Sequence, residues 1–352
     1  MNLLDQFGVN PDALKDQIAG VKIVPDRMAH IDADFLAYIV AADTVAEKDS
    51  GNLRSIVHKC GQLHDFADTV ARAAGAKDYI LHITPDDSNK GGRHEQAVQQ
   101  AYQGSRGERE RPEHLPIMRK YIEQKMRCIA SRTMEADDAM SMAMYADPVN
   151  NIVCSRDKDL RMVPGWHLDM ETNEHVFVEP GTFGYIEIDD TKSAKKVVGY
   201  GPAFFFAQCL MGDAADTVKG LPAIPGPILA RKSPSAAFTK QLHKVLGYQH
   251  RGEKVPEIEA ERLNAAMGKT KPCGAVGAFG LLEGVTTVKD AFALVKECFQ
   301  KLGDFHQYDF SHWRTGEPVT PTQALLGDMR LLWMRRTDNP DDVVVWLKEN
   351  AK

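Results

Sequence analysis

The stretch MAHIDADFLAYIVAA, residues 28–42, joins a short apolar run to a helical pattern. Residues 28–31 are typical of a buried strand, and residues 35–42 are typical of the helix that follows it. Asp32 therefore lies at the carboxyl end of the predicted strand. Asp34 is interpreted as a residue that starts the helix.

Two further apolar runs, at 78–84 and 151–155, repeat this arrangement. Acids follow each run: Asp86 and Asp87 after the first, Asp157 and Asp159 after the second. Strands that alternate with helices predict an α/β fold with a mostly parallel central sheet flanked by helices. Because ligands bind at the carboxyl ends of such strands, we expect these acids to share one cleft. Either Asp86 or Asp87 fits, and Asp87 is slightly preferred.

Two more acidic groups fall on predicted helices. Glu135 and Asp138 are three residues apart and share a helix face, with Asp137 beside them. Asp213 and Asp216 have the same spacing. Carboxylates held this close repel one another, so we expect a cation between them.

So many carboxylates are typical of phosphodiester hydrolysis with two Mg²⁺ or Mn²⁺ ions about 3.5–4 Å apart. Carboxylate oxygens are the hard ligands that these ions prefer. Mg²⁺ keeps several waters, so some of the acids are expected to act on the ion through water. The sequence leaves open which acids bind directly.

The charge distribution is uneven. A formal net charge of −6 disfavours a nucleic-acid partner, because phosphate binding relies on Lys and Arg. Residues 102–132, however, contain eight basic residues against four acidic ones, and residues 231–271 contain nine against four. The basic residues are therefore concentrated in two segments that can contact phosphates.

Length and composition indicate a globular protein, because 352 residues with 43% hydrophobic content can bury a large core. The six cysteines form no CxxC pair, so neither a zinc ribbon nor a disulfide framework is predicted, and a reducing cytoplasm suits them. His30, His82 and His94 lack metal-ligand spacing and are expected to be structural or exposed. No leader pattern and no run of about 20 apolar residues is present, so no membrane association is expected.

In combination, these motifs resemble the 5′-nuclease (flap endonuclease) superfamily. The motifs, in chain order, are HIDADF at Asp32, the acid at Asp86 or Asp87, MEADDAMS at Glu135 to Asp138, SRDKDL at Asp157 and Asp159, and GDAADTVKGLPAIPG at Asp213 and Asp216. The segment RLLWMRR at 330–336 is similar to phage-encoded members. The resemblance extends from about Arg27 to the C-terminal region.

The resemblance implies a catalytic α/β domain, a helical arch that accepts a DNA 5′ end, and a helix-hairpin-helix lobe that grips duplex DNA. The expected boundaries are an N-terminal extension at 1–26, the catalytic domain at 27–200 with the arch at about 88–132, the helical lobe at 201–340 with an insertion at about 227–273, and a tail at 341–352.

In the arch, the family typically has a YKGNR-like motif whose lysine contacts the scissile phosphate. Here residues 102–106 read YQGSR, so Arg106 is kept and Gln103 replaces the lysine. Either Lys90, Arg93 or Arg109 supplies the missing charge, or phosphate activation is weaker in this protein.

In the hairpin, the family usually has a continuous GVPGIGxKTA-like stretch that binds a phosphate, often with a monovalent cation. Here the motif begins with GLPAIPG at Gly220 to Gly226 and resumes only at Gly274. We interpret 227–273 as an insertion, with Gly274 opening the second helix towards a phosphate. The resemblance thus predicts DNA contacts at Gly220, Gly226 and Gly274, and K⁺ as a possible ion there.

The predicted enzyme is a metal-dependent 5′→3′ DNA exonuclease or flap endonuclease, with RNase H-type activity on hybrids also open. It is expected to be monomeric, to bind DNA, and to use no organic cofactor. Arg106 would orient the phosphate, and Lys90, Arg93 and Arg109 would contact DNA. The predicted metal ligands are Asp32, Asp87, Glu135, Asp137, Asp138, Asp157, Asp159, Asp213 and Asp216.

Two alternatives stay open. A haloacid-dehalogenase-like phosphatase would use Asp32 as nucleophile in a DxD motif with Asp34, but it leaves the acids at 135–138 without a role. A catalytically inactive protein that binds DNA junctions would keep the fold, but it gains nothing from repelling carboxylates.

Overall fold

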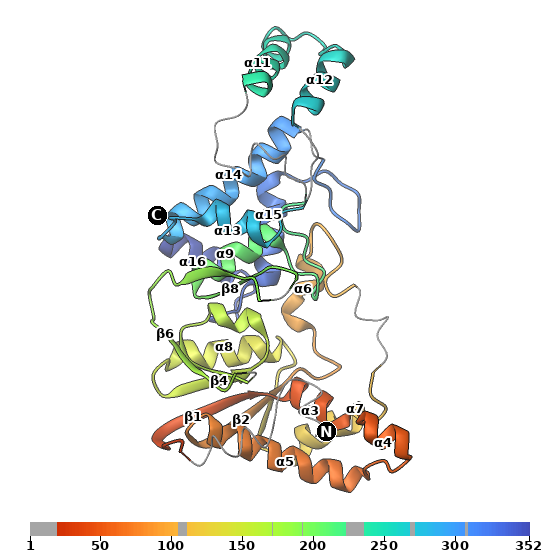
Figure 1. Ribbon diagram of the computed structural model, residues 1–352, viewed down its shortest axis with the longest axis vertical. Helices are drawn as coiled ribbons and strands as arrows, with labels where there is room; N and C mark the ends of the chain where they lie inside the picture. Colours follow the sequence, from red (N-terminus) through yellow and green to blue (C-terminus); the bar gives the residue numbers. More distant parts are fainter. Residues whose placement is uncertain are drawn as a thin grey trace.

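The computed structural model describes residues 20–104, 111–170, 172–191, 193–222, 236–267, 272–306 and 309–352. Arg106, Arg109 and Gly226 therefore lie outside the described residues. Figure 1 shows an elongated molecule, with an α/β part at the bottom, a helical lobe in the middle and a separate helical hairpin at the top.

The α/β part is built on a six-stranded sheet with strand order β3-β2-β1-β4-β5-β6. The strands are β1 (Val24–Asp32), β2 (Ala76–Ile83), β3 (Cys128–Ala130), β4 (Asn151–Ser155), β5 (Gly165–Asp169) and β6 (His175–Val178). The pairings among β1 to β5 are parallel, and β6 is antiparallel to β5. The predicted mostly parallel α/β sheet is confirmed.

The strand order determines where a ligand can bind. After β1 the chain adds β2 and β3 on one side, and it then crosses to place β4 on the other side of β1. The order therefore reverses between β1 and β4, and in open α/β sheets the crevice outside the carboxyl ends at this point holds the ligand. Asp32 ends β1, and Asp157 follows β4.

Helices cover both faces of the sheet. Apolar residues of β1 and β2, such as Ile31 and Leu81, share a buried core with Leu36 and Leu63 from the helices of one face. Met140 and Met144 of α8 belong instead to the core of the helical lobe. The helices and short helical turns of this part are α3 (Ala33–Ala41), α4 (Val45–Ser50), α5 (Ile56–Ala73), η1 (Lys90–Gly92), α6 (Arg93–Gln96), α7 (Leu115–Lys125), α8 (Ala136–Ala146) and η3 (Lys158–Met162).

The helical lobe is held together by apolar and aromatic packing. Its central helix α9 buries three consecutive phenylalanines at 204–206, and Trp333 stacks on Trp346 with ring centroids 4.4 Å apart. The lobe contains a two-stranded ribbon and five helices in the described residues: β7 (Tyr185–Asp189), β8 (Lys196–Tyr200), α9 (Pro202–Met211), α13 (Ala275–Leu282), α14 (Val288–His306), α15 (Pro321–Leu332) and α16 (Asp342–Asn350).

One segment differs from its expected role, and another lies within its expected boundaries. Residues 341–352, expected as a tail, form α16, whose Val343, Trp346 and Leu347 are buried in the lobe core. The segment expected as an insertion contains a helical hairpin, α11 (Ala236–His250) and α12 (Glu257–Met267), with a small apolar cluster of its own around Val245 and Leu263. This hairpin lies at the top of the molecule in Figure 1.

Candidate metal centre

The first group of carboxylates lies at the point where the strand order reverses. It comprises Asp32 at the end of β1, Asp137 in the first turn of α8, and Asp157 after β4. Ser155 Oγ donates a hydrogen bond to Asp32 Oδ2 over 3.0 Å and accepts one from the Asp157 amide over 2.9 Å. The structure therefore joins the ends of two neighbouring parallel strands through one serine.

Negative charge in this group is poorly compensated. Burial, followed by repulsion from Asp34, raises the pKa of Asp32 to about 6. Burial also raises the pKa of Asp157 to about 6. The pKa of Asp137 is raised well above its ordinary value by burial and then by Asp157 and Asp32. A divalent cation would remove this repulsion, because it favours the ionised form of each carboxylate.

The second group comprises Asp159 of η3 with Asp213 and Asp216 of the loop after α9. One oxygen of each carboxylate lies within 4.8 Å of the others. The loop is tight: Asp213 pairs with Val218 as an isolated β-bridge, and a Cβ on Gly212 would lie 2.3 Å from Val218 O. The glycine therefore allows the close crossing that brings Asp213 and Asp216 to η3.

A lysine is bound to this second group. Lys158 Nζ lies 2.7 Å from Asp159 Oδ1 and 2.6 Å from Asp213 Oδ2. Burial raises the pKa of Asp159 to about 7, with repulsion from Asp157 adding to it. Burial also acts to raise the pKa of Asp213. The charge and hydrogen bond of Lys158 lower it by more, so the pKa of Asp213 lies below its ordinary value. Lys158 is thus a cation held where the carboxylates converge.

The two groups adjoin each other. The Asp159 amide donates to Asp157 Oδ1 over 2.8 Å, and the charge of Asp216 helps to raise the pKa of Asp157. All six residues offer carboxylate oxygens, which are the hard ligands that Mg²⁺ and Mn²⁺ prefer. The donor set therefore fits two neighbouring divalent cations.

Glu135 and Asp138 have a different surrounding. Arg93 is fully buried, and its guanidinium binds Asp138 through two hydrogen bonds of 2.8 Å and also pairs with Glu135. The Arg335 amide donates to Asp138 Oδ1 over 3.2 Å. Two assignments are therefore corrected. Asp138, predicted as a metal ligand, is neutralised by the two-pronged contact with Arg93. Arg93, predicted to contact DNA, is too deeply buried to do so.

The same network reaches residues far along the chain. Arg93 Nη2 donates to Trp333 O over 3.1 Å, and Arg335 Nη2 donates to Gly91 O over 2.6 Å. Gly91 has a φ of 67°, and a Cβ there would lie 2.4 Å from the Arg335 guanidinium. The segment before α6 is thus packed directly against the segment after α15.

Tyr102 and Gln103 link Glu135 to the second carboxylate group. Tyr102 Oη lies 2.8 Å from Glu135 Oε2 and 3.2 Å from Asp216 Oδ2. Gln103 Nε2 donates to Glu135 Oε1 over 3.2 Å and to Asp216 Oδ1 over 3.3 Å. Lys90 Nζ donates to Gln103 Oε1 and lies 4.0 Å from Glu135 Oε1. Of the three candidates for the missing arch charge, Lys90 is placed beside Gln103.

Asp34 joins the first group in place of Asp87. The Asp34 carboxylate accepts the Thr84 amide over 3.0 Å, pairs with Arg119, and raises the pKa of Asp32. The Asp87 side chain is 67% exposed and pairs with Arg132, while Asp86 is 85% exposed. The sequence did contain a signal for Asp34, since it is two residues after Asp32 in HIDADF.

The basic segment does not form one continuous arch in the described residues. Leu115, Met118 and Ile122 of α7 are buried in the sheet core. Arg119 pairs with Asp34 and Arg132 with Asp87 and Glu123, so these arginines are already engaged.

At the hairpin motif, only one of the two described glycines is open to a ligand. The Gly220 amide donates to buried Asp328 over 3.0 Å, and it is therefore used within the fold. Gly274 is the N-cap of α13, and no atom of another residue in the described part lies within 4 Å of the position that a Cβ would occupy there.

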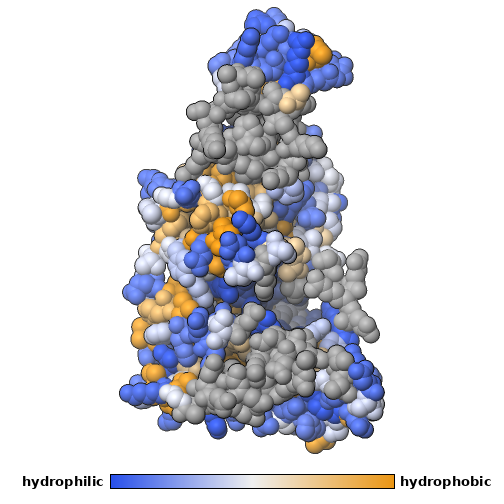
Figure 2. Space-filling view, viewed as in Figure 1, coloured by the Kyte–Doolittle hydropathy of each residue, from blue (hydrophilic) through white to orange (hydrophobic). Residues whose placement is uncertain are grey.

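The surface around the carboxylates is polar. Figure 2 shows hydrophilic residues lining the recess between the α/β part and the helical lobe. In the part of the chain that the structure describes, no helix is both long and apolar enough to span a membrane.

The matches to known proteins come from solved structures alone. No family model and no curated protein sequence matches the chain. Solved structures that match include a flap endonuclease and a 5′-exonuclease.

Two of these structures are from bacteriophage T5. A flap endonuclease in a pseudo-enzyme–product complex with DNA and metal ions is 11% identical, covering 87% of this chain and 99% of its own, with a TM-score of 0.38. A 5′-exonuclease with zinc ions bound is 13% identical, covering 79% and 94%, with a TM-score of 0.37.

Proposed function

We propose that the protein is a divalent-metal-dependent DNA nuclease that acts from the 5′ end, as an exonuclease or flap endonuclease. The observation that carries this proposal is the pair of adjoining carboxylate groups at the point where the strand order reverses. One group brings together three acids whose pKa values are raised by burial, and the other brings three oxygens within 4.8 Å.

In this proposal, Asp32, Asp137 and Asp157 would hold one Mg²⁺ or Mn²⁺ ion, with Asp34 beside them. The second ion would be held by Asp159, Asp213 and Asp216. Bound ions of this kind activate water and stabilise the leaving oxygen of a phosphodiester. Lys158 Nζ now lies between Asp159 and Asp213, so it must move aside when that site fills.

The residues around the two groups would orient them and the phosphate. Arg93 fixes Glu135 and Asp138, and Glu135 accepts hydrogen bonds from Tyr102 and Gln103. Gln103 in turn connects to Asp216, so the segment at 102–104 joins the two sides of the site. Lys90, beside Gln103, would supply positive charge for the phosphate.

The preference for DNA and for a 5′ end rests on the sequence resemblance. Arg106 would orient the phosphate and Arg109 would contact DNA. Gly274 would meet the duplex at the start of α13, with K⁺ as a possible ion at the hairpin. The proposed enzyme is a cytoplasmic monomer without an organic cofactor. A phage origin, with a role in DNA replication, recombination or degradation of host DNA, is part of the same proposal.

The phosphatase alternative has less support from the geometry. Its mechanism needs Asp34 to act on the substrate, but the Asp34 carboxylate is bound by the Thr84 amide and by Arg119. The inactive DNA-binding alternative differs from the nuclease in whether DNA is cleaved, which the digestion experiment measures.

The test is digestion of 5′-labelled and 3′-labelled duplex and flapped DNA with Mg²⁺ or with EDTA. Asp137→Asn is expected to reduce cleavage by at least about 100-fold, because it removes a ligand of the ion that activates water. Asp87→Asn is the matched control, since that carboxylate is exposed and paired with Arg132, and it is expected to cleave normally.

Mg²⁺-dependent release of label from the 5′ end, lost in Asp137→Asn, would support the proposal, and the product length would separate exonuclease from flap endonuclease. Intact DNA in every reaction, or equal cleavage by Asp137→Asn and wild type, would refute it. Phosphatase assays on small phosphate esters would follow.

A further inference from the structure

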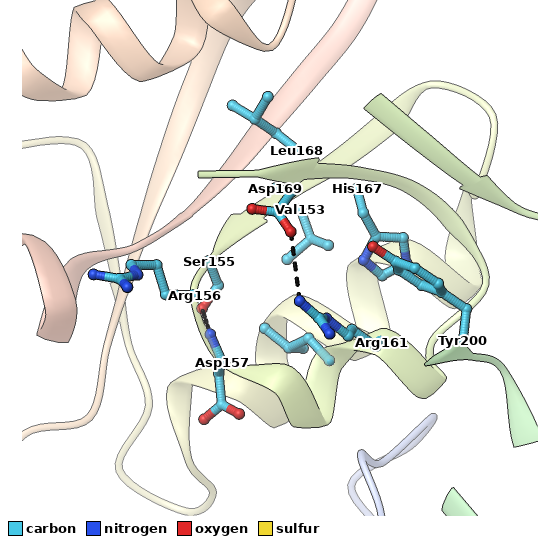
Figure 3. A pocket seen from close by; sticks show the side chains of 10 residues that line it. Val153, Ser155, Arg156, Asp157, Arg161, His167, Leu168, Asp169 and Tyr200 are labelled. Atoms are coloured by element: carbon cyan, nitrogen blue, oxygen red, sulfur yellow. Dashed lines mark hydrogen bonds and ion pairs between the residues drawn. The ribbon is translucent and has the colours of Figure 1, made fainter. Parts of the chain in front are cut away.

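A polar hollow of about 80 Å³ opens beside the first carboxylate group, at the carboxyl ends of β4 and β5. Its walls include Ser155 and Asp157 on one side and Arg161, His167, Asp169 and Tyr200 on the other. Figure 3 shows Arg161 reaching across the hollow towards Asp169, with the Tyr200 ring beside it. Arg161, His167, Asp169 and Tyr200 have no role in the metal sites proposed above.

Arg161 is held in place but is only weakly neutralised. Its guanidinium carbon lies 5.7 Å from the centre of the Tyr200 ring, a cation–π contact that orients the group. Its Nη2 lies 3.4 Å from Asp169 Oδ2, which is long for a charged hydrogen bond. Among the described residues this is the one ion pair of Arg161, although a guanidinium has five N–H donors.

Two arginines line the hollow, and Figure 3 shows Arg156 pointing away from Arg161 and Asp169. The guanidinium carbon of Arg156 lies 5.5 Å from the centre of the Phe35 ring. Burial lowers the pKa of His167 to about 4, so this histidine is neutral at pH 7. Its Nε2 lies 2.8 Å from Val163 O, and its ring packs edge-on against Tyr200. Asp169 also accepts the Thr172 amide over 3.1 Å through Oδ1, so its other oxygen is the one that faces Arg161.

The position of Arg161 relates it to the carboxylates. Arg161 and Asp159 belong to the same short helix, η3, and are separated by two residues. Asp157 of the first carboxylate group also lines the hollow, so the hollow adjoins the carboxylates directly. A strand with one phosphate at the carboxylates therefore has a neighbouring phosphate within reach of the hollow.

From this arrangement we infer that Arg161 binds a backbone phosphate of the substrate strand, adjacent to the phosphate that is cleaved. This inference rests on the proposed function and adds a phosphate subsite to it. Guanidinium suits a phosphate because its fork can donate two parallel hydrogen bonds, and Tyr200 keeps the fork oriented. Asp169 would keep the arginine aimed at the hollow when no phosphate is present.

The experiment pairs one protein change with one DNA change. Binding of a 5′-flapped duplex is measured by fluorescence anisotropy in Ca²⁺, after confirming that the DNA stays intact. Single methylphosphonates, which carry no charge, replace the phosphates near the cleavage position one at a time. The proteins are wild type, Arg161→Met, and Arg127→Met as control. Arg127 also pairs with an aspartate, Asp78, but it lies before β3, at the amino end of the strands.

Wild type is expected to lose about tenfold in affinity at one methylphosphonate position, corresponding to one charged hydrogen-bonded contact. Arg161→Met is expected to bind unmodified DNA about tenfold more weakly, to show no further loss at that position, and to lower the salt slope of binding by about 1. Arg127→Met should behave as wild type at every position.

Equal losses for wild type and Arg161→Met at every position would overturn the inference, as would a wild type that is insensitive to all methylphosphonates. If Arg161→Met unfolds, Arg161→Lys replaces it, because that variant keeps the charge but loses the two-pronged geometry. Sensitivity confined to the terminal 5′-phosphate would assign the hollow to a nucleotide end and would also overturn it. Mg²⁺-dependent cleavage by wild type is measured in parallel, so that failure of the nuclease proposal is recognised separately.

Discussion

The first turn of α8 carries acids with two different surroundings. Asp137 faces Asp32 and Asp157, and its pKa is raised well above its ordinary value by burial and by those charges. Glu135 and Asp138, on either side of it, face the buried guanidinium of Arg93. The neighbouring carboxylates thus differ in whether the chain supplies their counter-charge. A carboxylate without a counter-charge from the chain, such as Asp137, is the better candidate for binding an ion from solution.

The largest expected effect comes from removing Arg93, the cation that pairs with Glu135 and Asp138. Arg93→Met leaves Glu135 and Asp138 buried without their partner, and breaking a buried pair in this way costs about 3–5 kcal/mol. Urea denaturation of metal-free protein measures the loss. Arg132→Met, which breaks an exposed pair with Asp87, is the control and should change stability little. Equal stability of Arg93→Met and wild type would refute the comparison.

A second prediction concerns a buried base that has no acid partner. His82 Nε2 lies 2.8 Å from His30 Nδ1, and burial, followed by the charge of His30, lowers the pKa of His82 to about 3. The unfolded chain, with an ordinary pKa near 6.5, binds this proton more readily than the folded protein. The stability that His82 contributes is therefore complete above pH 6.5 and is lost as the pH falls from about 6.5 towards 3.

At pH 5 this loss is about 2 kcal/mol relative to pH 7. Denaturation at both pH values, compared between wild type and His82→Leu, measures it, and the variant should lack this part of the pH dependence. A pH dependence that is identical in the two proteins would contradict the assignment.

The smallest effect is expected where the chain supplies a cation that a metal must replace. Lys158→Met should tighten Mn²⁺ binding about three- to tenfold, because the lysine no longer competes for Asp159 and Asp213. Isothermal titration with Mn²⁺ measures this. Lys244→Met is a matched control: its side chain is 48% exposed and pairs with Glu259 at 2.7 Å, whereas that of Lys158 is 46% exposed. Weaker Mn²⁺ binding in Lys158→Met would show that the lysine supports the site.

The strand ends could be predicted from sequence, because an apolar run that stops at an acid places that acid at the edge of the sheet. This held for Asp32 and Asp157, which Ser155 links. The turn after β2 was harder. Asp86 and Asp87 follow the strand in sequence, but their side chains are exposed, and Asp34 lies beside Asp32 instead. Sequence spacing does not give the direction of a side chain in a turn.

The burial of a charged residue could not be predicted from the sequence either. Arg93 is basic and lies in a predicted DNA-binding segment, but its two acid partners and the carbonyl of Trp333 enclose it. The last of these is 240 residues away along the chain. The same holds for α16, which was expected as a tail because a short terminal segment gives no sign of the core it covers. Long-range packing decides both cases.

The contacts of Arg335 have a consequence for the order in which the chain is made. Ribosomes release the N-terminal part first, so the nine carboxylates predicted as ligands emerge well before residues 333–335. Until then Arg93 lacks the Trp333 carbonyl, and Asp138 lacks the Arg335 amide. The growing chain therefore carries the carboxylates before it carries the contacts that complete the surroundings of Arg93 and Asp138.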